Sequence, residues 1–491
     1  MTKVRQAVAL AVSAGLVAST GWSAEPGTRD PMTEIIVIAP HGSGIARARV
    51  PSSVQTATAE DIERVQPLDI TELLNRSFAG VNINHAQSNP LQPDVNFRGF
   101  TASPLLGLPQ GLSVYQNGVR INEPFGDTVN WDLIPLSAIQ SVQVIGGANP
   151  VFGLNSLGGA LTLKTKNGLD YRGTEAQIYS GSFDRTVASL QHGGHGETFG
   201  FYGNVDYFEE DGWRDFSKSD ALRYLGVLSW RGSDDSELNL TFSGGETELR
   251  GNGSSPVELL AIDREQVFTH PDITENSQMQ FILDGQHRFS EALSFSGNMH
   301  YREIDTDTFN GDGTIFEECD FDGEELLVEE DFDDLNEDDE CSSADDAGIV
   351  VVLGQDGEPI EAELDDEELD AINNLGRREQ ESYGASLQLT WSSDWNGRAN
   401  DLILGAAVNE GRIAFDSATE VARNVLGYQW AARSRVGPDE LVLELGVLIN
   451  GRPVGVHVPP DAETNVTPPG RLSVSVVAVA ALVPLLTTVR E

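Results

Sequence analysis

The sequence has few positive charges for its length. Its 491 residues include 31 Lys and Arg against 77 Asp and Glu, which gives a formal net charge of −46 at pH 7. This balance argues against binding to nucleic acid or to an anionic surface through bulk charge, because such binding depends on Lys and Arg. The acidity is concentrated: 26 acidic residues and no basic residue lie between Glu317 and Asp370.

Catalytic and metal-binding motifs are also missing. The sequence has no GxSxG or HExxH motif, no phosphate-binding loop of the Walker type and no clustered Cys and His set. Its histidines, among them His85, His192, His195 and His287, are scattered without the spacing of metal ligands. We therefore expect no enzyme, no bound metal and no cofactor.

The amino terminus has no apolar run long enough to span a membrane. Lys3 and Arg5 precede a short apolar core over residues 7–17, and small residues follow up to Ala24. This order is typical of a secretory signal peptide, which we predict for residues 1–24. An exported protein favours disulfides, so the two cysteines, Cys319 and Cys341, predict one disulfide that closes a loop in the acidic segment.

Short β-type runs separated by Gly and Pro follow, from about Pro67 to Lys166. They predict a small mixed domain of hairpins with one or two helices. Asp69 or Thr71 can cap a helix that carries Leu73 and Leu74. The motif residues of this stretch are Arg98, Gly99, Phe100, Gly118, Arg120, Gly146, Gly147, Gly153, Gly158 and Gly159.

In order and spacing, these motifs resemble the plug domain of TonB-dependent outer-membrane receptors. The resemblance implies a plug domain over residues 45–168. It also implies a TonB box, the segment that such receptors present to the inner-membrane protein TonB. We identify that box with Thr33, Glu34, Ile35, Ile36, Val37, Ile38 and Ala39. The alternative is that residues 33–39 form the first strand of the plug itself.

After Lys166 the sequence alternates between apolar and polar residues. Alternation of period two predicts strands, and recurring aromatic residues with short turns opposite long loops are typical of an outer-membrane β-barrel. A soluble β-sandwich is the alternative for the same pattern. The predicted strands are Ala176–Ser182, Thr186–Gln191, Phe199–Phe208, Leu222–Trp230, Glu237–Phe242, Gln278–His287, Ser294–Tyr301, Tyr383–Trp391 and Asp401–Val408.

The longest predicted loop covers residues 306–377 and contains the acidic segment. Within it, residues 310–315 resemble a fragment of a calcium-binding loop but fail the full ligand spacing. A solvated, charged extracellular loop is the interpretation we prefer, because charge runs are usually solvated.

The pattern stops before a full barrel is reached. Plugged barrels of this type have about 22 strands, and only nine are predicted here. The period-two pattern ends near Asp416, and residues 472–489 read as a marginal transmembrane helix interrupted by Pro484. We expect that residues 423–491 are not receptor sequence. A frameshift would produce such a segment. Translating the other two reading frames of the gene tests this expectation.

The predicted fold is therefore mainly β: a small α/β plug domain, then an incomplete antiparallel transmembrane β-barrel over residues 170–416. The resemblance implies a receptor in the outer membrane of a Gram-negative bacterium that takes up a scarce ligand. That ligand is a siderophore, cobalamin, heme or an oligosaccharide, and the partners are TonB, outer-membrane lipid and the small molecule or metal chelate. Two alternatives stay open, a non-functional receptor fragment and a secreted β-rich calcium-binding adhesin.

Overall fold

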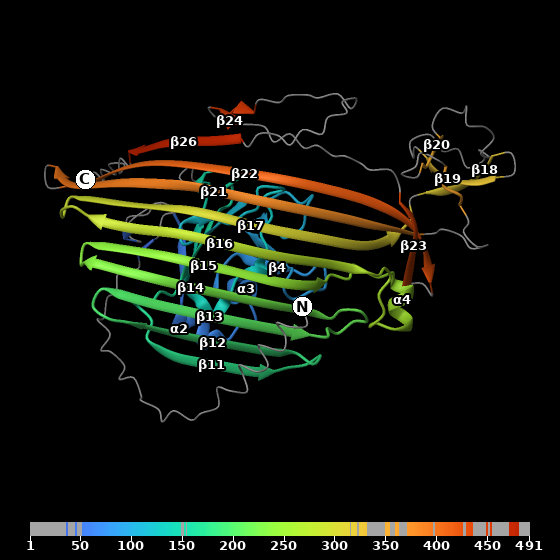
Figure 1. The fold of residues 1–491 in the computed structure, drawn as a ribbon, viewed down its shortest axis with the longest axis horizontal. Helices are drawn as coiled ribbons and strands as arrows, with labels where there is room; N and C mark the ends of the chain where they lie inside the picture. The colour runs from blue at the N-terminus through green and yellow to red at the C-terminus, as the bar shows by residue number, and fades with distance from the viewer. Residues whose placement is uncertain are drawn as a thin grey trace, which may run out of the picture. The chain divides into compact units, whose positions relative to one another are not determined.

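A computed structural model of the chain describes the central part of the sequence and several shorter segments (Figure 1). The described residues are 36–37, 45–46, 52–148, 152–153, 155–314, 316–321, 324–330, 349–353, 359–362, 371–395, 398–425, 429–435, 448–449, 452–453 and 471–480. The predicted signal peptide lies outside them. The described segments give a mainly β protein with two parts, which we call the plug (residues 54–165) and the wall (the sheet that follows it).

The plug contains two small sheets, two short α-helices and two 3-10 helices, η2 (Trp131–Leu133) and η3 (Leu136–Ala138). The five-stranded sheet has the order β3-β9-β10-β7-β8, and the three-stranded sheet has the order β4-β5-β6. Strand β10 pairs in parallel with β7 and antiparallel with β9, so the larger sheet is mixed. The bounds are β3 (Val54–Thr58), α2 (Ala59–Val65), α3 (Ile70–Ser77), β4 (Val81–Asn84), β5 (Asp94–Phe97), β6 (Phe100–Ala102), β7 (Leu112–Gln116), β8 (Val119–Arg120), β9 (Ile139–Gly146) and β10 (Gly159–Thr165).

The predicted helix cap is confirmed. Asp69 is the N-cap of α3, and its side chain accepts a hydrogen bond of 2.8 Å from the backbone N–H of Glu72. The cap satisfies one of the helix N–H groups that have no partner within the helix. Leu73 and Leu74 then point into the plug core, where both are buried.

Two tight turns explain why glycine follows a polar residue in the motifs. Arg98 and Gly99 connect β5 to β6 with φ angles of 52° and 87°, and Asn117 and Gly118 connect β7 to β8 with φ angles of 48° and 82°. Two-residue hairpin loops with both φ angles positive match the right-handed twist of the flanking strands. Glycine at the second position adopts this conformation without a steric penalty.

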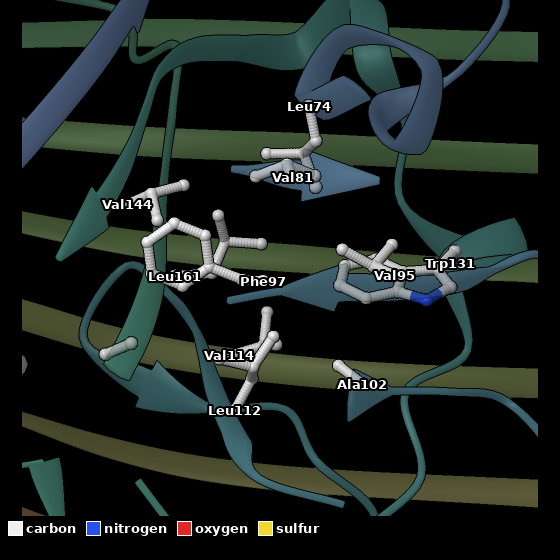
Figure 2. Close-up of a pocket in the computed structure, with 11 residues that line it drawn as sticks. Leu74, Val81, Val95, Phe97, Ala102, Leu112, Val114, Trp131, Val144 and Leu161 are labelled. Atoms are coloured by element: carbon white, nitrogen blue, oxygen red, sulfur yellow. The ribbon is translucent and has the colours of Figure 1, made fainter. Parts of the chain in front are cut away.

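The two plug sheets and α3 share one apolar core. Figure 2 shows side chains from the smaller sheet, such as Val95 and Phe97, next to Val114 and Leu161 from the larger sheet. These side chains surround a cavity of about 20 Å³. Its lining is apolar, so a water molecule inside would lack the polar partners it needs, about two to four.

The wall is one antiparallel sheet whose strands follow one another in chain order (Figure 1). Each strand of the order β11-β12-β13-β14-β15-β16-β17-β21-β22-β23 pairs with the next, and β26 also pairs with β22. The bounds are β11 (Gly173–Ser180), β12 (Thr186–His195), β13 (Phe199–Glu210), β14 (Ser219–Ser233), β15 (Ser236–Arg250), β16 (Asp272–Arg288), β17 (Leu293–Gly313), β21 (Ala371–Trp395), β22 (Arg398–Val425), β23 (Gln429–Arg435) and β26 (Arg471–Ala480).

The two faces of the wall have the reverse polarity of a soluble sheet. On β13, Asn204 and Asp206 are buried, whereas the alternate residues Phe201 and Val205 are exposed. Trp391 on β21 follows the same alternation, and 50% of its surface is exposed. Polar side chains facing inward and apolar side chains facing outward are the pattern of a transmembrane barrel. This polarity rules out the β-sandwich, and the predicted incomplete antiparallel barrel is confirmed.

All nine predicted wall strands are present, and most of them are longer than predicted. Strand β17 continues to Gly313 and β21 begins at Ala371, so the predicted loop over 306–377 was wrong at both ends. Strand β22 continues to Val425, past the predicted barrel end at residue 416. Period-two counting misses these extensions because the outward side chains there are polar and the alternation disappears.

The acidic segment also differs from the predicted solvated loop. It contains a small sheet of β18 (Glu317–Phe321), β19 (Glu324–Glu330) and β20 (Ile349–Val351). A core cluster that includes Leu327 and Val352 joins this sheet to Ile372 of β21 and Val421 of β22. The residues 310–313 of the suspected calcium-loop fragment lie in β17. Among the described residues, no group of three or more His, Cys, Asp or Glu is arranged to hold a metal ion.

The carboxyl-terminal segment departs from the prediction as well. Residues 471–480 form strand β26, which pairs antiparallel with β22, where the sequence predicted the start of a helix. Two further two-residue strands, β24 (Leu448–Ile449) and β25 (Arg452–Pro453), pair with each other. In the part of the chain that the structure describes, no helix is long and apolar enough to cross a membrane.

Candidate functional site

The glycine motifs bring the β5–β6 hairpin against the β9–β10 hairpin. A Cβ atom on Gly158 would lie 2.5 Å from the Cβ of Phe100, and one on Gly146 would lie 3.0 Å from an Arg98 guanidinium nitrogen. At Gly158 only hydrogen lets Phe100 pack this closely, whereas the Arg98 guanidinium next to Gly146 is the end of a flexible side chain and can shift. Gly159 is more restricted, since its φ is 140° and a Cβ atom there would lie 2.1 Å from the carbonyl oxygen of Ile145. The motif therefore shapes the plug backbone.

The remaining motif residues are spread over three turns. Arg120 forms an ion pair with Asp127, which also accepts a hydrogen bond of 2.6 Å from Asn155. Gly147 and Gly153 have φ angles of 98° and 70°, with open space where a Cβ atom would be. These turns shape the surface of the plug and do not form a catalytic site. The carbonyl oxygen of Gly118 accepts a hydrogen bond of 3.1 Å from Asn298 of β17, so one motif turn contacts the wall.

A buried ion pair joins the plug to the wall. Both carboxylate oxygens of Glu123 accept hydrogen bonds from Arg302 of β17, at 2.5 and 3.0 Å. The Arg302 and Glu123 side chains are 5% and 1% exposed. The same guanidinium donates to Gln278 of β16 and to the carbonyl oxygen of Ile121. Two-point pairing fixes the orientation of both groups, and the extra acceptors satisfy the remaining N–H donors.

A second set of contacts joins the plug to earlier wall strands. Asp132 accepts hydrogen bonds from Thr247 of β15, at 2.6 Å, and Asn276 of β16, at 3.0 Å. Ser137 donates to Asp206 of β13, at 2.5 Å. Each of these contacts joins one carboxylate to a neutral donor. The interface as a whole is polar, as expected where one part must fit inside a hydrophilic barrel interior.

Comparison with known families decides what the plug is. A family model described as the TonB-dependent receptor plug domain matches residues 46–160. Residues 46–160 are a TonB-dependent receptor plug domain. The matched stretch contains all ten motif residues from Arg98 to Gly159, so the predicted plug is confirmed.

Curated and solved relatives of this plug domain are transporters and receptors. Over 143 residues the chain is 26% identical to the vitamin B12 transporter BtuB of Vibrio cholerae serotype O1, a match that covers 29% of this chain and 22% of BtuB. The fold is similar to the ferripyoverdine receptor of Pseudomonas aeruginosa, with a TM-score of 0.54 and 13% identity over 79% of this chain and 46% of that receptor. It is equally similar to BauA, the ferric preacinetobactin receptor of Acinetobacter baumannii, with a TM-score of 0.54 and 13% identity over 83% and 52% of the two chains.

The chain spans about half the length of these solved receptors. The relatives named above are described as transporters and receptors.

The predicted TonB box is described only in part. Ile36 and Val37 form β1, which pairs antiparallel with Ala46 and Ile45 of β2 (Ile45–Ala46). The other five predicted box residues lie outside the described part of the chain. Backbone pairing at Ile36 and Val37 places the centre of the segment in an extended conformation.

Cys319 lies in β18, in the small sheet between β17 and β21. Cys319 is disulfide-bonded and 1% exposed, and no described cysteine is free. Cys341 is the other cysteine of the sequence and lies outside the described residues.

Sequence reasoning missed the residues that join the plug to the wall. Glu123, Asp132 and Arg302 belong to no motif and are far apart along the chain. A signal was nevertheless present, because Arg302 falls at an inward position of the period-two pattern of β17. A charged residue at such a position needs a partner inside the barrel. The sequence does not say which plug residue supplies it.

Burial raises the pKa of the acidic groups in the plug. Desolvation raises the pKa of Asp69 from its ordinary value of 3.8 to about 6, despite the hydrogen bonds from Glu72 and Thr71. Burial likewise raises the pKa of Glu123 and of Asp132, and Arg302 opposes the shift at Glu123. A carboxyl group with a raised pKa in the fold favours the folded state below its unfolded pKa, and this contribution is lost as the pH rises through the folded value.

We expect Asp69→Asn to stabilise the plug at pH 8 and to have little effect near pH 4. Asparagine caps helices as well as aspartate does, and the variant removes a buried negative charge. The upper limit is about 3 kcal/mol for a shift of about two pH units. Hydrogen exchange of the α3 amides, compared with the wild-type chain at each pH, measures the effect.

Asp61→Asn is the control, because the pKa of Asp61 is shifted in the opposite direction. A hydrogen bond from the backbone N–H of Thr58 lowers the pKa of Asp61. Its contribution to stability is therefore present at neutral pH and lost as the pH falls through the lowered pKa. If both variants change plug stability in the same direction at pH 8, burial of Asp69 is not the cause.

Proposed function

We propose that this chain is the plug and the first part of the wall of a TonB-dependent outer-membrane receptor. The complete receptor takes up a scarce ligand of the siderophore, cobalamin, heme or oligosaccharide class. One observation carries the proposal: a plug domain is hydrogen-bonded to the polar face of a sheet whose other face is apolar and exposed. That arrangement suits a stopper inside a barrel surrounded by lipid.

The proposed cycle uses the two ends of the plug differently. A ligand binds on the extracellular side, to plug loops and wall loops. The TonB box then adds as a strand to TonB in the periplasm, a mode in which backbone hydrogen bonds supply the affinity. Energy from the inner-membrane proton gradient displaces the plug, and the ligand passes through the barrel.

Two plug loops are the proposed ligand-facing segments, residues 87–93 and 102–110. Asn89 in the first loop donates hydrogen bonds to Ser219 and to the carbonyl oxygen of Arg250, at the ends of β14 and β15 where the wall has its longer connections. In the second loop, Leu106 and Leu108 are each 39% exposed. Exposed leucines at a loop tip are available for contact with the apolar parts of a ligand.

Fractionation and heat-modifiability test the proposal. We expect the expressed chain in the outer-membrane fraction, and a complete version of the receptor to migrate differently on a gel before and after boiling, as closed barrels do. A mobility of the expressed chain itself that heating leaves unchanged would favour the non-functional fragment. Recovery in the medium, without co-precipitation of the periplasmic domain of TonB, would favour the secreted adhesin.

A further inference from the structure

We infer that Arg378 of β21 binds a negatively charged oxygen group of the ligand, such as a carboxylate. The inference rests on the proposed function, because it assumes that a ligand enters from the side of the longer wall connections. Within the proposed ligand class it selects anionic compounds, such as ferric chelates that carry carboxylates or heme with its propionates. A neutral oligosaccharide does not fit it.

Arg378 is a buried cation without a hydrogen-bonded partner. It is 8% exposed, and in the part of the chain that the structure describes its side chain makes no hydrogen bond and no ion pair. A guanidinium group presents five N–H donors, accepts no hydrogen bond and stays charged. Burial of such a group without acceptors is costly. We therefore expect an acceptor at this position that the described chain does not supply.

Arg302 shows how a guanidinium group in the same sheet is satisfied. It donates to both carboxylate oxygens of Glu123 and to Gln278. Glu123 also attracts Arg378 electrostatically, but its oxygens already accept hydrogen bonds from Arg302 and Asn130. One carboxylate thus serves two guanidinium groups, and one positive charge is left over.

The position of Arg378 in β21 puts it on the inner face of the wall. Gln380, two residues along the same face, accepts a hydrogen bond of 3.0 Å from the backbone N–H of Phe125 of the plug. Arg378 pairs with Thr306 of β17 and with Phe415 of β22, whose ring stacks on that of Phe125. Arg378 therefore lies one inward position beyond Gln380, toward the longer wall connections.

The next inward positions in that direction are small, polar and uncharged. They belong to β17, β21 and β22, which pair side by side (Figure 1), and their side chains are partly exposed. The residues are Thr308, Asn310, Asn374, Gly376, Ser417 and Thr419. Hydroxyl and amide groups can donate further hydrogen bonds to an anion that reaches Arg378.

The acidic side chains of these strands lie mainly on the other face. The outward positions of the same stretch include Asp305, Asp307, Glu379 and Asp416. On these three strands, Asp312 near the end of β17 is the first inward carboxylate beyond the polar surface. The inner face around Arg378 is therefore electropositive, although the chain as a whole is strongly acidic.

Thiol labelling of the full chain in detergent measures this charge without a ligand. Ser417→Cys places a thiol at the inward position that pairs with Gly376, and Ala418→Cys places one at the adjacent outward position as the control. No described cysteine is free to react. Adding Arg378→Gln should lower the ratio of the anionic to the cationic methanethiosulfonate labelling rate at residue 417 by about tenfold, through loss of one nearby charge. The ratio at residue 418 should change less than about twofold. An unchanged ratio at residue 417 would overturn the inference.

Protection of the same thiol tests anion binding. Citrate and inorganic phosphate are the anionic probes, maltohexaose is the neutral one, and an uncharged maleimide is the label. At saturation, citrate or phosphate should slow labelling of Ser417→Cys at least about threefold, and Arg378→Gln should abolish this protection. Protection by citrate alone supports a carboxylate site, and protection by phosphate alone supports a phosphate site. No protection by either anion, or equal protection in Arg378→Gln, would overturn the inference.

Stability distinguishes a binding residue from a structural partner of Glu123. Arg302→Gln should speed hydrogen exchange of the Glu123 amide on the order of 100-fold, because it leaves a buried carboxylate without its partner. Arg378→Gln should change that exchange less than about threefold, since it removes a charge that lacks acceptors. Equal effects would show that Arg378 serves the fold. None of these measurements needs transport, so anion binding by a chain that fails to reach the outer membrane would remove the proposed function and leave the site.

Discussion

Gly159→Ala is expected to unfold the plug while the wall strands stay paired. The glycine has a φ of 140°, a conformation essentially restricted to glycine, and an added Cβ atom would overlap the carbonyl oxygen of Ile145 at 2.1 Å. Gly159 and Ala160 pair with Gly146 and Ile145 in the centre of the larger plug sheet, so β9 and β10 cannot move apart without breaking their ladder. We expect a loss of at least about 3 kcal/mol, from backbone strain together with steric overlap.

Two other glycines provide matched controls. Gly107 has a φ of 81° but open space around a Cβ atom, so Gly107→Ala should cost only about 1 kcal/mol from its backbone conformation. Gly196 has neither restriction, and Gly196→Ala should leave stability unchanged. Hydrogen exchange of the β9 and β10 amides in urea measures all three. Similar losses for Gly159→Ala and Gly107→Ala would mean that the contact with Ile145 is not decisive.

Ile36→Pro is expected to abolish ligand uptake by a version of the receptor with a complete wall. Proline has no backbone N–H, so it removes a hydrogen bond from any strand that residues 33–39 form with TonB. Ile36 already pairs with Ala46 in the structure, which shows that this position adopts the extended conformation that strand addition needs. We expect uptake to fall at least tenfold and to depend on TonB in the wild type.

Uptake of a labelled ligand in cells is the measurement, with surface binding assayed in parallel. Ile36→Val keeps the N–H group and the strand preference, and should retain uptake. Ligand binding at the cell surface should survive both substitutions, because the segment precedes the plug. Unchanged uptake by Ile36→Pro would show that residues 33–39 are not the TonB box.

The amino-acid pattern was a good guide where the structure depends on neighbours in the chain. Asp69 three residues before Glu72 indicates a helix cap, and Asn117-Gly118 indicates a tight hairpin, because both interactions close within a few residues. The wall strands were found for the same reason, since side chains two residues apart share a face. Polar residues near the loop ends removed the alternation, and there the predicted ends were wrong.

The sequence by itself determined the kind of protein: a glycine-patterned domain followed by strands of period two. Only the tertiary structure decided which plug residues contact which wall residues. Glu123 and Arg302 are separated by 179 residues, and Asp132 and Asn276 by 144. The physical reason is that the local pattern shows that a buried charge needs a partner. Which residue is that partner depends on strand register and on the way the plug fits against the wall.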